Sequence, residues 1–367
     1  INESIERVIN MTKLAPKDPM VSLASQTIDK IPDLDLFDSH DLKPDDLKDL
    51  ALRTEEASLK IKGINNSNGA SSSQSKTSFH LSTSNGFSGG YKKSNYSISC
   101  SSIAGDDLNM QTDYDYDSKV FFKDLKDELS IGEKAAKNTL AKCNPKKIKT
   151  CTSDIVFDPR VSRTILAHFS SLINGASIAR GSSFLSEKMN TKIFNKDVNI
   201  IDDPSILRGI ASKPFDDEGC GIQKLNIVQN GNLNSWILDT TTAKQLNLNS
   251  NNRASRGMSS PPSPSSTNMF IENGSFSVNE IIKNIKDGFY VTDLIGQGVN
   301  LITGDYSRGA GGFKIEDGNI TFPINEVTIA DNLKDMFSRM IIANDLDFKY
   351  SINSPTILIE GMKITGI

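Results

Sequence analysis

The sequence predicts an α+β fold, in which a central region of helices and antiparallel strands precedes a larger, β-rich C-terminal region. Residues 32–144 show helical periodicity at both ends and strand-like runs between them. An Asn85-Gly86 pair separates two of these runs, which is a strong hairpin signal. Beyond Asn190 most apolar runs are short and separated by turn residues, as is typical of strands.

Composition narrows the class of protein. A length of 367 residues suggests two or three domains, and a hydrophobic share of 37% suffices for real cores. The 41 basic and 45 acidic residues leave a net charge of −4, which disfavours direct binding to nucleic acid. The four cysteines form no CxxC pair, which indicates reduced thiols and a cytoplasmic protein. The longest charge-free apolar segment, residues 164–179, is too short and too polar to cross a membrane.

The first segment is helical in pattern. Apolar residues recur at helical spacing over residues 1–14, and Pro16 and Pro19 end the pattern. The chain starts without Met and inside this helix. Residues 1–31 are therefore expected to be a remnant helix and linker of an N-terminal region that is mostly absent.

Residues 32–144 are expected to form the central α+β domain. Pro44 marks a helix start, and apolar residues at helical spacing continue to about residue 61. Residues 65–76 (NNSNGASSSQSK) predict a solvated loop or a hairpin turn. The remaining patterns predict four strands and a closing helix: strands at 79–83, 87–91, 96–103 and 110–116, and a helix at 125–140.

Residues 149–367 are expected to form the β-rich C-terminal domain. A strand at 149–156 precedes a nearly uncharged helix at 162–179, which should be buried on most sides. Residues 247–266 are polar with three prolines and predict a long surface loop. The other patterns predict strands at 198–201, 225–228, 233–239, 289–295, 301–303, 312–316, 319–323 and 355–364, and helices at 278–286 and 330–338.

Common catalytic motifs are absent from the sequence. The three histidines, His40, His80 and His168, form no HExxH, no HxH and no pair with a cysteine at metal spacing. There is no GxSxG motif and no Walker A sequence. On residue types alone, a metal site in this chain is disfavoured.

The densest cluster of unusual residues is Gly304–Phe313 (GDYSRGAGGF), with four glycines in ten residues. Such a stretch is either a series of tight turns or a strand that another backbone approaches closely. We hypothesise that residues 306–313 border a partner's cleft or a peptide path, in which Arg308 meets a carboxylate or a peptide carbonyl. The residues assigned to this channel are Tyr306, Arg308, Gly309, Gly311 and Gly312.

Several long segments also match a known family in the same order. They are SSFLSEKMNTKIF (182–194), LRGIASKPFDDEG (207–219), SWILDTTTAKQLNL (235–248), FYVTDLIGQGVNLITGDYSRG (289–309) and GDYSRGAGGFKIEDGNITFPINEVTIADNLKDMF (304–337). With them the chain resembles the TldE/PmbA branch of the TldD/PmbA family. That resemblance implies a cytosolic peptide-processing system. Its TldD subunit is a zinc metalloprotease with an HExxxH helix and a C-terminal cysteine ligand, and TldE/PmbA is the heterodimer partner.

The catalytic residues of the zinc subunit are mostly replaced in this chain. By the resemblance, the HExxxH segment falls on residues 168–173: the first histidine is kept as His168, Phe169 replaces the glutamate, and Ile173 replaces the second histidine. The cysteine position falls near Ser354. Catalytic zinc needs three protein ligands, and a phenylalanine cannot deprotonate metal-bound water. The resemblance therefore implies no catalytic and no metal-binding residue here, and zinc in the catalytic partner subunit.

The preferred hypothesis is a non-catalytic subunit of a TldD/TldE-type cytoplasmic metalloprotease complex that processes peptides. Its partners would be a TldD-type subunit and an unfolded polypeptide, with a homodimer when the chain is alone and with no membrane or direct nucleic-acid contact. One alternative is a metallopeptidase that is active on its own through an unrecognised ligand set. Another is a regulator of DNA gyrase, since the family's older name is modulator of DNA gyrase.

Overall fold

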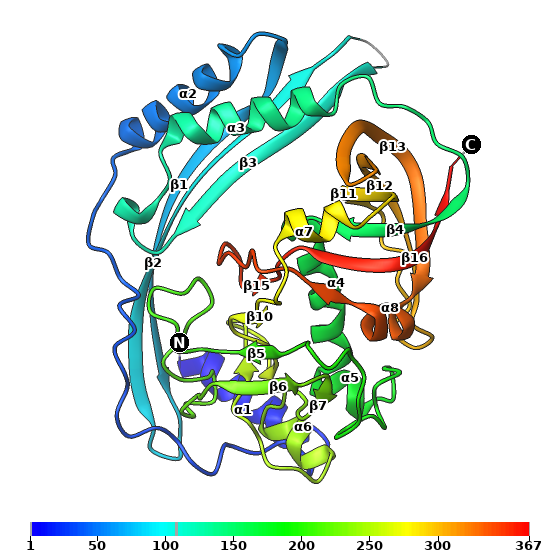
Figure 1. Ribbon diagram of the computed structural model, residues 1–367. Helices are drawn as coiled ribbons and strands as arrows, with labels where there is room; N and C mark the ends of the chain where they lie inside the picture. Colours follow the sequence, from blue (N-terminus) through cyan, green and yellow to red (C-terminus); the bar gives the residue numbers. More distant parts are fainter. Residues whose placement is uncertain (1, 107–108, 367) are drawn as a thin grey trace.

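The computed structural model describes residues 2–106 and 109–366 and confirms the α+β class (Figure 1). The first helix, α1 (Asn2–Leu14), covers the predicted segment except Ile1, which lies outside the described residues. This helix buries none of its side chains. None of the helices in the described part of the chain combines the length and the apolar character that a membrane crossing needs.

The central region is a three-stranded antiparallel sheet with two helices side by side on one face (Figure 1). Alternate residues of the middle strand, Tyr96, Ile98 and Cys100, point into this helix-covered face and are buried. Ile98 and Cys100 pack with Leu50 and Ile131 of the two helices. The elements are α2 (Pro44–Leu59), β1 (Ile64–Ser82), β2 (Ser88–Ala104), β3 (Gln111–Lys119), a 3-10 turn (Phe122–Asp124) and α3 (Glu128–Ala141).

The prediction of a loop or turn at residues 65–76 is wrong, because this segment belongs to the 19-residue strand β1. Across the sheet, serine hydroxyls of β1 and β2 form hydrogen-bonded pairs: Ser71 with Ser99 (2.9 Å) and Ser73 with Ser97 (2.8 Å). Hydroxyl pairs stabilise the solvent-facing side of the sheet without apolar contacts. The predicted hairpin at Asn85-Gly86 is confirmed, although the two strands predicted after it are one strand, β2.

The C-terminal region contains two larger sheets. One has the strand order β13-β12-β11-β4-β16-β14, and an additional pairing of β13 with β16 closes five of its strands into a ring. The other has the order β15-β10-β5-β6-β7, and β8 pairs with β9 separately. The strands are β4 (Cys151–Phe157), β5 (Ile200–Asp202), β6 (Leu225–Gln229), β7 (Asn232–Leu233), β8 (Ala254–Ser255), β9 (Ser263–Pro264), β10 (Met269–Ile271), β11 (Asp287–Ile295), β12 (Asp305–Glu316), β13 (Asn319–Asn332), β14 (Ile341–Ile342), β15 (Ile352–Asn353) and β16 (Ile357–Thr365).

Helix α4 (Pro159–Leu172) runs between the two sheets and belongs to the hydrophobic core that both share (Figure 1). The helix predicted at 162–179 is in fact two, because the Asn174 side chain accepts a hydrogen bond from the Ala176 amide (3.0 Å) and starts a new helix. The strand predicted at 301–303 is a turn. Of the strand predicted at 233–239, only Leu233 lies in a strand, β7. The remaining helices are α5 (Gly175–Ala179), α6 (Thr240–Gln245), α7 (Val278–Lys283) and α8 (Leu333–Arg339).

The segment 247–266 is not the free surface loop that its composition predicts. Its Arg253 side chain is 1% exposed and forms an ion pair with Asp202 of β5 (Nε to Oδ2, 2.6 Å). The same carboxylate accepts hydrogen bonds from the amide and hydroxyl of Thr267. A buried, hydrogen-bonded ion pair thus anchors this segment to the sheet.

Among the contacts that join the central region to the C-terminal region, two lie at opposite ends of the central sheet. At the hairpin end of β1 and β2, three aromatic rings surround the buried ring of Phe215, with centroids 5.1–6.1 Å away: Phe79, Phe87 and Tyr91. Near the other end of the sheet, the Asp113 carboxylate of β3 pairs with Arg160 of α4 (2.8 Å) and with Lys142 (2.8 Å). Lys142 also pairs with Asp293 of β11 (2.6 Å).

The Asp113 side chain is only 1% exposed. Burial acts to raise the pKa of this carboxyl, but the hydrogen bonds and charges of Arg160 and Lys142 outweigh it and lower that pKa. Removing the carboxylate leaves both cations partly desolvated without their main partner. We therefore expect Asp113→Ala to lower the free energy of unfolding by about 3–5 kcal/mol, measured by urea denaturation at pH 7.

The matched control for this prediction is Lys137→Ala, which removes an exposed pair with Glu133 (3.3 Å) on α3. Exposed pairs contribute little, so this variant is expected to lose less than about 1 kcal/mol. Similar losses in the two variants would contradict the assigned role of Asp113.

Candidate functional site

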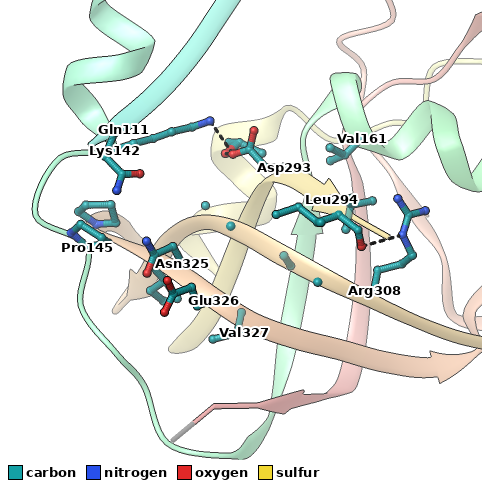
Figure 2. A pocket seen from close by; sticks show the side chains of 18 of the residues that line it. Gln111, Lys142, Pro145, Val161, Asp293, Leu294, Arg308, Asn325, Glu326 and Val327 are labelled. Carbon is teal, nitrogen blue, oxygen red and sulfur yellow. Dashed lines mark hydrogen bonds and ion pairs between the residues drawn. The ribbon is translucent and has the colours of Figure 1, made fainter. Parts of the chain in front are cut away.

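A cavity of about 640 Å³ lies between the central region and the C-terminal region (Figure 2). The central region contributes the start of β3 and the connection after α3, where Lys142 and Pro145 lie. The C-terminal region contributes α4 and the adjacent strands β11, β12 and β13. The volume falls in the range of cavities that hold small ligands or short peptide segments.

The Lys142–Asp293 ion pair bridges the two regions across the cavity (Figure 2). Arg160 of α4 also lines the cavity, and Asp113 lies behind it. Because Lys142 contacts both Asp113 and Asp293, one ammonium group connects β3 with β11. The distance between the walls of the cavity is therefore set by a network of charged groups.

The structure brings most of the predicted channel residues to this cavity. Arg308, Gly309, Gly311 and Gly312 line it, whereas Tyr306 is 1% exposed and packs in the core beside His168, with ring centroids 6.4 Å apart. The segment is a strand rather than a series of turns. Since β12 pairs with β11 on one side and with β13 on the other, no peptide can add to β12 by backbone hydrogen bonds.

The glycines of β12 differ in what they permit. A Cβ atom at Gly312 would lie 1.9 Å from the carbonyl oxygen of Tyr290, so glycine is required there by the close approach of β11. At Gly311 the nearest atom would be 3.7 Å away, and at Gly309 it would be 3.4 Å away. These two positions have room for a side chain, and their glycines leave the floor of the cavity bare.

The positions that the resemblance matches to the zinc motif lie at the end of α4. Phe169 is fully buried and packs edge-to-face against Phe194 (5.1 Å) and Phe337 (5.9 Å). Ile173 is also fully buried and caps the helix, with its amide bonded to the Phe169 carbonyl (3.1 Å). This is ordinary α-helical spacing, in which positions five apart point about 140° away from each other.

The four positions do not fit a three-ligand zinc site. His168 Nε2 is buried without a hydrogen-bond partner, and burial together with the charge of Arg308 lowers the pKa of this imidazole. The Ser354 hydroxyl donates to the Pro355 carbonyl (3.0 Å), and the Ser162 hydroxyl donates to the same carbonyl (2.8 Å). Ser162 precedes His168 by six residues, or about 9 Å along the helix axis, so Ser354 sits beside an earlier turn of α4.

Within residues 2–106 and 109–366, one group of three side chains has the spacing of a metal site: Asp216, Glu218 and Cys220. Their atoms are already engaged. Asp216 Oδ1 accepts the amides of Glu218 and Cys220, and Glu218 Oε2 accepts the amide and hydroxyl of Thr240. Burial raises the pKa of the Cys220 thiol to about 12, and this thiol donates to the Gln26 carbonyl. The cluster holds loops and the start of α6 in place.

The sequence analysis missed Lys142 and Arg160, which line the cavity, and their shared partner Asp113. One available signal was the alternation of Asp113, Asp115 and Asp117 along a predicted strand. A period of two places three carboxylates on one face of the sheet, and all three are buried. Buried carboxylates require cationic partners, which indicates a charged contact with another part of the chain.

Comparison with known proteins assigns the two regions to one family. The model of the PmbA/TldA metallopeptidase central domain matches residues 37–142, and that of the C-terminal domain matches residues 150–366. The metalloprotease PmbA homologue of Haemophilus influenzae is 34% identical over 370 residues, which cover 100% of this chain and 80% of that protein. The metalloprotease PmbA of Escherichia coli O157:H7 is 33% identical with the same coverage.

Solved structures have the same fold. A crystal structure from Bacteroides thetaiotaomicron, of a protein named as a candidate modulator of DNA gyrase, superimposes with a TM-score of 0.91 at 29% identity. It covers 100% of this chain and 82% of that chain. TldE from Thermococcus kodakarensis has a TM-score of 0.85 at 23% identity, covers 99% of this chain and 84% of that chain, and bears on the fold alone.

Restoring the motif residues tests whether the end of α4 keeps a metal-site geometry. In the triple variant Phe169→Glu, Ile173→His, Ser354→Cys, a carboxylate enters the fully buried Phe169 position, and the Phe169 contacts are lost. We expect it to bind zinc weakly or not at all and to lose at least about 3 kcal/mol of stability. Elemental analysis and denaturant titration measure these effects. The control Ser171→Glu, at an exposed position of α4, should change stability by less than about 0.5 kcal/mol. One zinc per chain with unchanged stability would refute the prediction.

Glu218 predicts a pH dependence of stability. Burial raises the pKa of this carboxyl to about 7, although the hydrogen bonds from Thr240 act to lower it. The folded state therefore binds more protons than the unfolded state between about pH 4.5 and 7, so this group's contribution to stability falls as the pH rises through that window. Glu218→Gln keeps an acceptor oxygen and cannot ionise, so its Tm should exceed that of the parent at pH 8 and approach it at pH 5.

The control for this pH dependence is Glu280→Gln at the start of α7. Hydrogen bonds from the amide and hydroxyl of Ser277 lower the pKa of Glu280. Its contribution has the opposite sign and is present at high pH. This variant should therefore have a lower Tm than the parent at pH 8. A lower Tm for Glu218→Gln at pH 8 would contradict the assignment.

Proposed function

The chain belongs to the PmbA/TldE branch of the PmbA/TldD metallopeptidase family, and from this premise we propose that it is a non-catalytic, peptide-binding subunit of a zinc metallopeptidase complex. The observation that supports the proposal is the apolar packing at the end of α4, at the positions that the resemblance matches to the zinc motif. His168 is followed by Phe169 and Ile173, both fully buried in the core. Without the zinc and the general base, hydrolysis in such a complex has to occur on a TldD-type catalytic subunit.

The cavity supports the peptide-binding part of the proposal. It opens between two regions of the chain, and the bare backbone at Gly309 and Gly311 allows an extended peptide to approach its floor. Strand β3 is an outer strand of its sheet among the described residues, and its residues Gln111 and Thr112 line the cavity. An outer strand offers backbone hydrogen bonds to a peptide in any sequence, which suits a subunit that handles unfolded chains.

The proposal includes a cytoplasmic heterodimer with a TldD-type subunit and a homodimer when the chain is alone. The four cysteines are all unpaired thiols, in keeping with a reducing compartment. No residue in this chain is assigned to the chemical step. Its part is to bind and align the peptide and to keep the cavity in shape through Lys142, Arg160 and Asp113.

We expect the purified chain to contain no stoichiometric zinc and to cleave no unfolded polypeptide, because only His168 remains of the three ligands and Phe169 stands in place of the general base. Mixing it with the TldD-type subunit from the same genome should yield a zinc-containing complex that cleaves a fluorescently labelled, reduced and alkylated protein. Size-exclusion chromatography measures complex formation, elemental analysis measures zinc content, and fluorescence release measures cleavage. Zinc-dependent cleavage by the chain alone, abolished by a chelator, would instead support a self-sufficient metallopeptidase.

A further inference from the structure

The cavity between the two regions carries an excess of positive charge. Four cationic side chains line it against two acidic ones: Lys142, Arg160, Arg163 and Arg308 against Asp293 and Glu326. Both acidic groups are already paired, Asp293 with Lys142 and Glu326 with Lys147. Arg160 is paired with Asp113 and Asp158. The two remaining cations, Arg163 and Arg308, have no carboxylate at ion-pair distance within the described part of the chain.

Arg308 extends from the middle of β12 and is 8% exposed (Figure 2). Its Nε donates to the carbonyl of Ile295 at 3.3 Å. This contact leaves both terminal nitrogens without a hydrogen-bond partner among residues 2–106 and 109–366. A guanidinium that is nine-tenths buried is costly unless its charge is paired and its N–H groups are bonded. Its terminal nitrogens therefore have donors available for a group in the cavity.

Arg163 approaches the same cavity from helix α4. Its guanidinium stacks on the ring of Tyr350, 4.0 Å from the centroid, and its Nε is buried with no hydrogen-bond partner among the residues that the structure describes. Burial lowers the pKa of this group, so the folded protein holds the charge at a cost. Stacking fixes the plane of the guanidinium and leaves its edge for an acceptor.

We propose that Arg163 and Arg308 form a carboxylate-binding subsite, which takes the C-terminal carboxylate or an acidic side chain of a peptide in the cavity. This inference rests on the proposed peptide-binding function and specifies the peptides that it favours. Arginine binds carboxylates through two parallel N–H···O bonds, and both guanidiniums belong to the lining of the one cavity. The rest of the cavity contacts the backbone of the peptide. The subsite adds a preference for acidic peptides and fixes the direction in which the peptide binds.

The test uses the full chain and three acetylated hexapeptides of glycine, serine and alanine. The first has a free C-terminal carboxylate, the second is its C-terminal amide, and the third is an amide with one central glutamate. Calorimetric titration gives the Kd of each. We expect the second peptide, which has no carboxylate, to bind at least about tenfold more weakly than whichever of the other two binds more tightly. Which of them binds better identifies the source of the carboxylate.

The variants separate the subsite from the rest of the cavity. Arg308→Gln and Arg163→Gln should each weaken the acidic peptide about tenfold and leave the amide unchanged, and Arg308→Lys should recover part of the loss. Arg180→Gln, at the exposed end of α5, is the control that should change neither Kd. Gly311→Val narrows the cavity and should weaken all three peptides alike.

The outcomes for the two proposals differ. Equal Kd values for acid and amide, all weakened by Gly311→Val, would overturn the carboxylate subsite and leave the peptide-binding function standing. Failure of every peptide to bind would overturn both. Circular dichroism of each variant establishes that a change in Kd does not come from unfolding.

Discussion

The architecture of the cavity depends on the buried carboxylate of Asp113. This group lies on the outer strand of the central sheet and contacts a helix of the other region through Arg160 and a strand of it through Lys142 and Asp293. The aromatic contacts around Phe215 hold the far end of the same sheet. The sheet is thus held to the C-terminal region at two separate places. At the cavity, a polar network sets a distance between the walls, whereas apolar side chains would pack together.

The end of α4 is part of the hydrophobic core. Phe169 and Ile173, which the resemblance matches to a glutamate and a histidine of the zinc motif, pack among aromatic and aliphatic neighbours. His168 keeps its place beside Tyr306, with a neutral imidazole favoured by burial and by the charge of Arg308. Arg308, whose charge acts on His168, also lines the cavity in which the proposed peptide would bind. Binding and hydrolysis can therefore be divided between two related chains, since each needs a different set of side chains.

Local signals predicted the elements whose structure is decided locally. Pro44 marks the start of α2, and Asn85-Gly86 marks the hairpin, because each sets backbone angles without help from distant residues. The serine-rich strand could not be predicted, since its hydroxyl pairs exist only when β2 lies beside it. The same holds for Arg253, whose partner Asp202 is 51 residues away, and for the cavity, where Arg163 and Arg308 come from separate elements. The glycine-rich segment was found by composition, although its pairing on both sides depends on the whole sheet.

The ring of strands in the C-terminal region has a consequence for synthesis on the ribosome. Ile357 of β16 pairs with Phe157 of β4, 200 positions earlier in the chain, and β16 also pairs with β13. Strand β4 thus emerges long before the partner that completes its sheet, and the ring closes only after β16 has been translated. The central sheet, in contrast, is built from neighbouring segments and has all its strands at an early stage. A transcript truncated just before β16 would yield a chain with a folded first half and exposed strand edges in the second, which is the state that chaperones and proteases recognise.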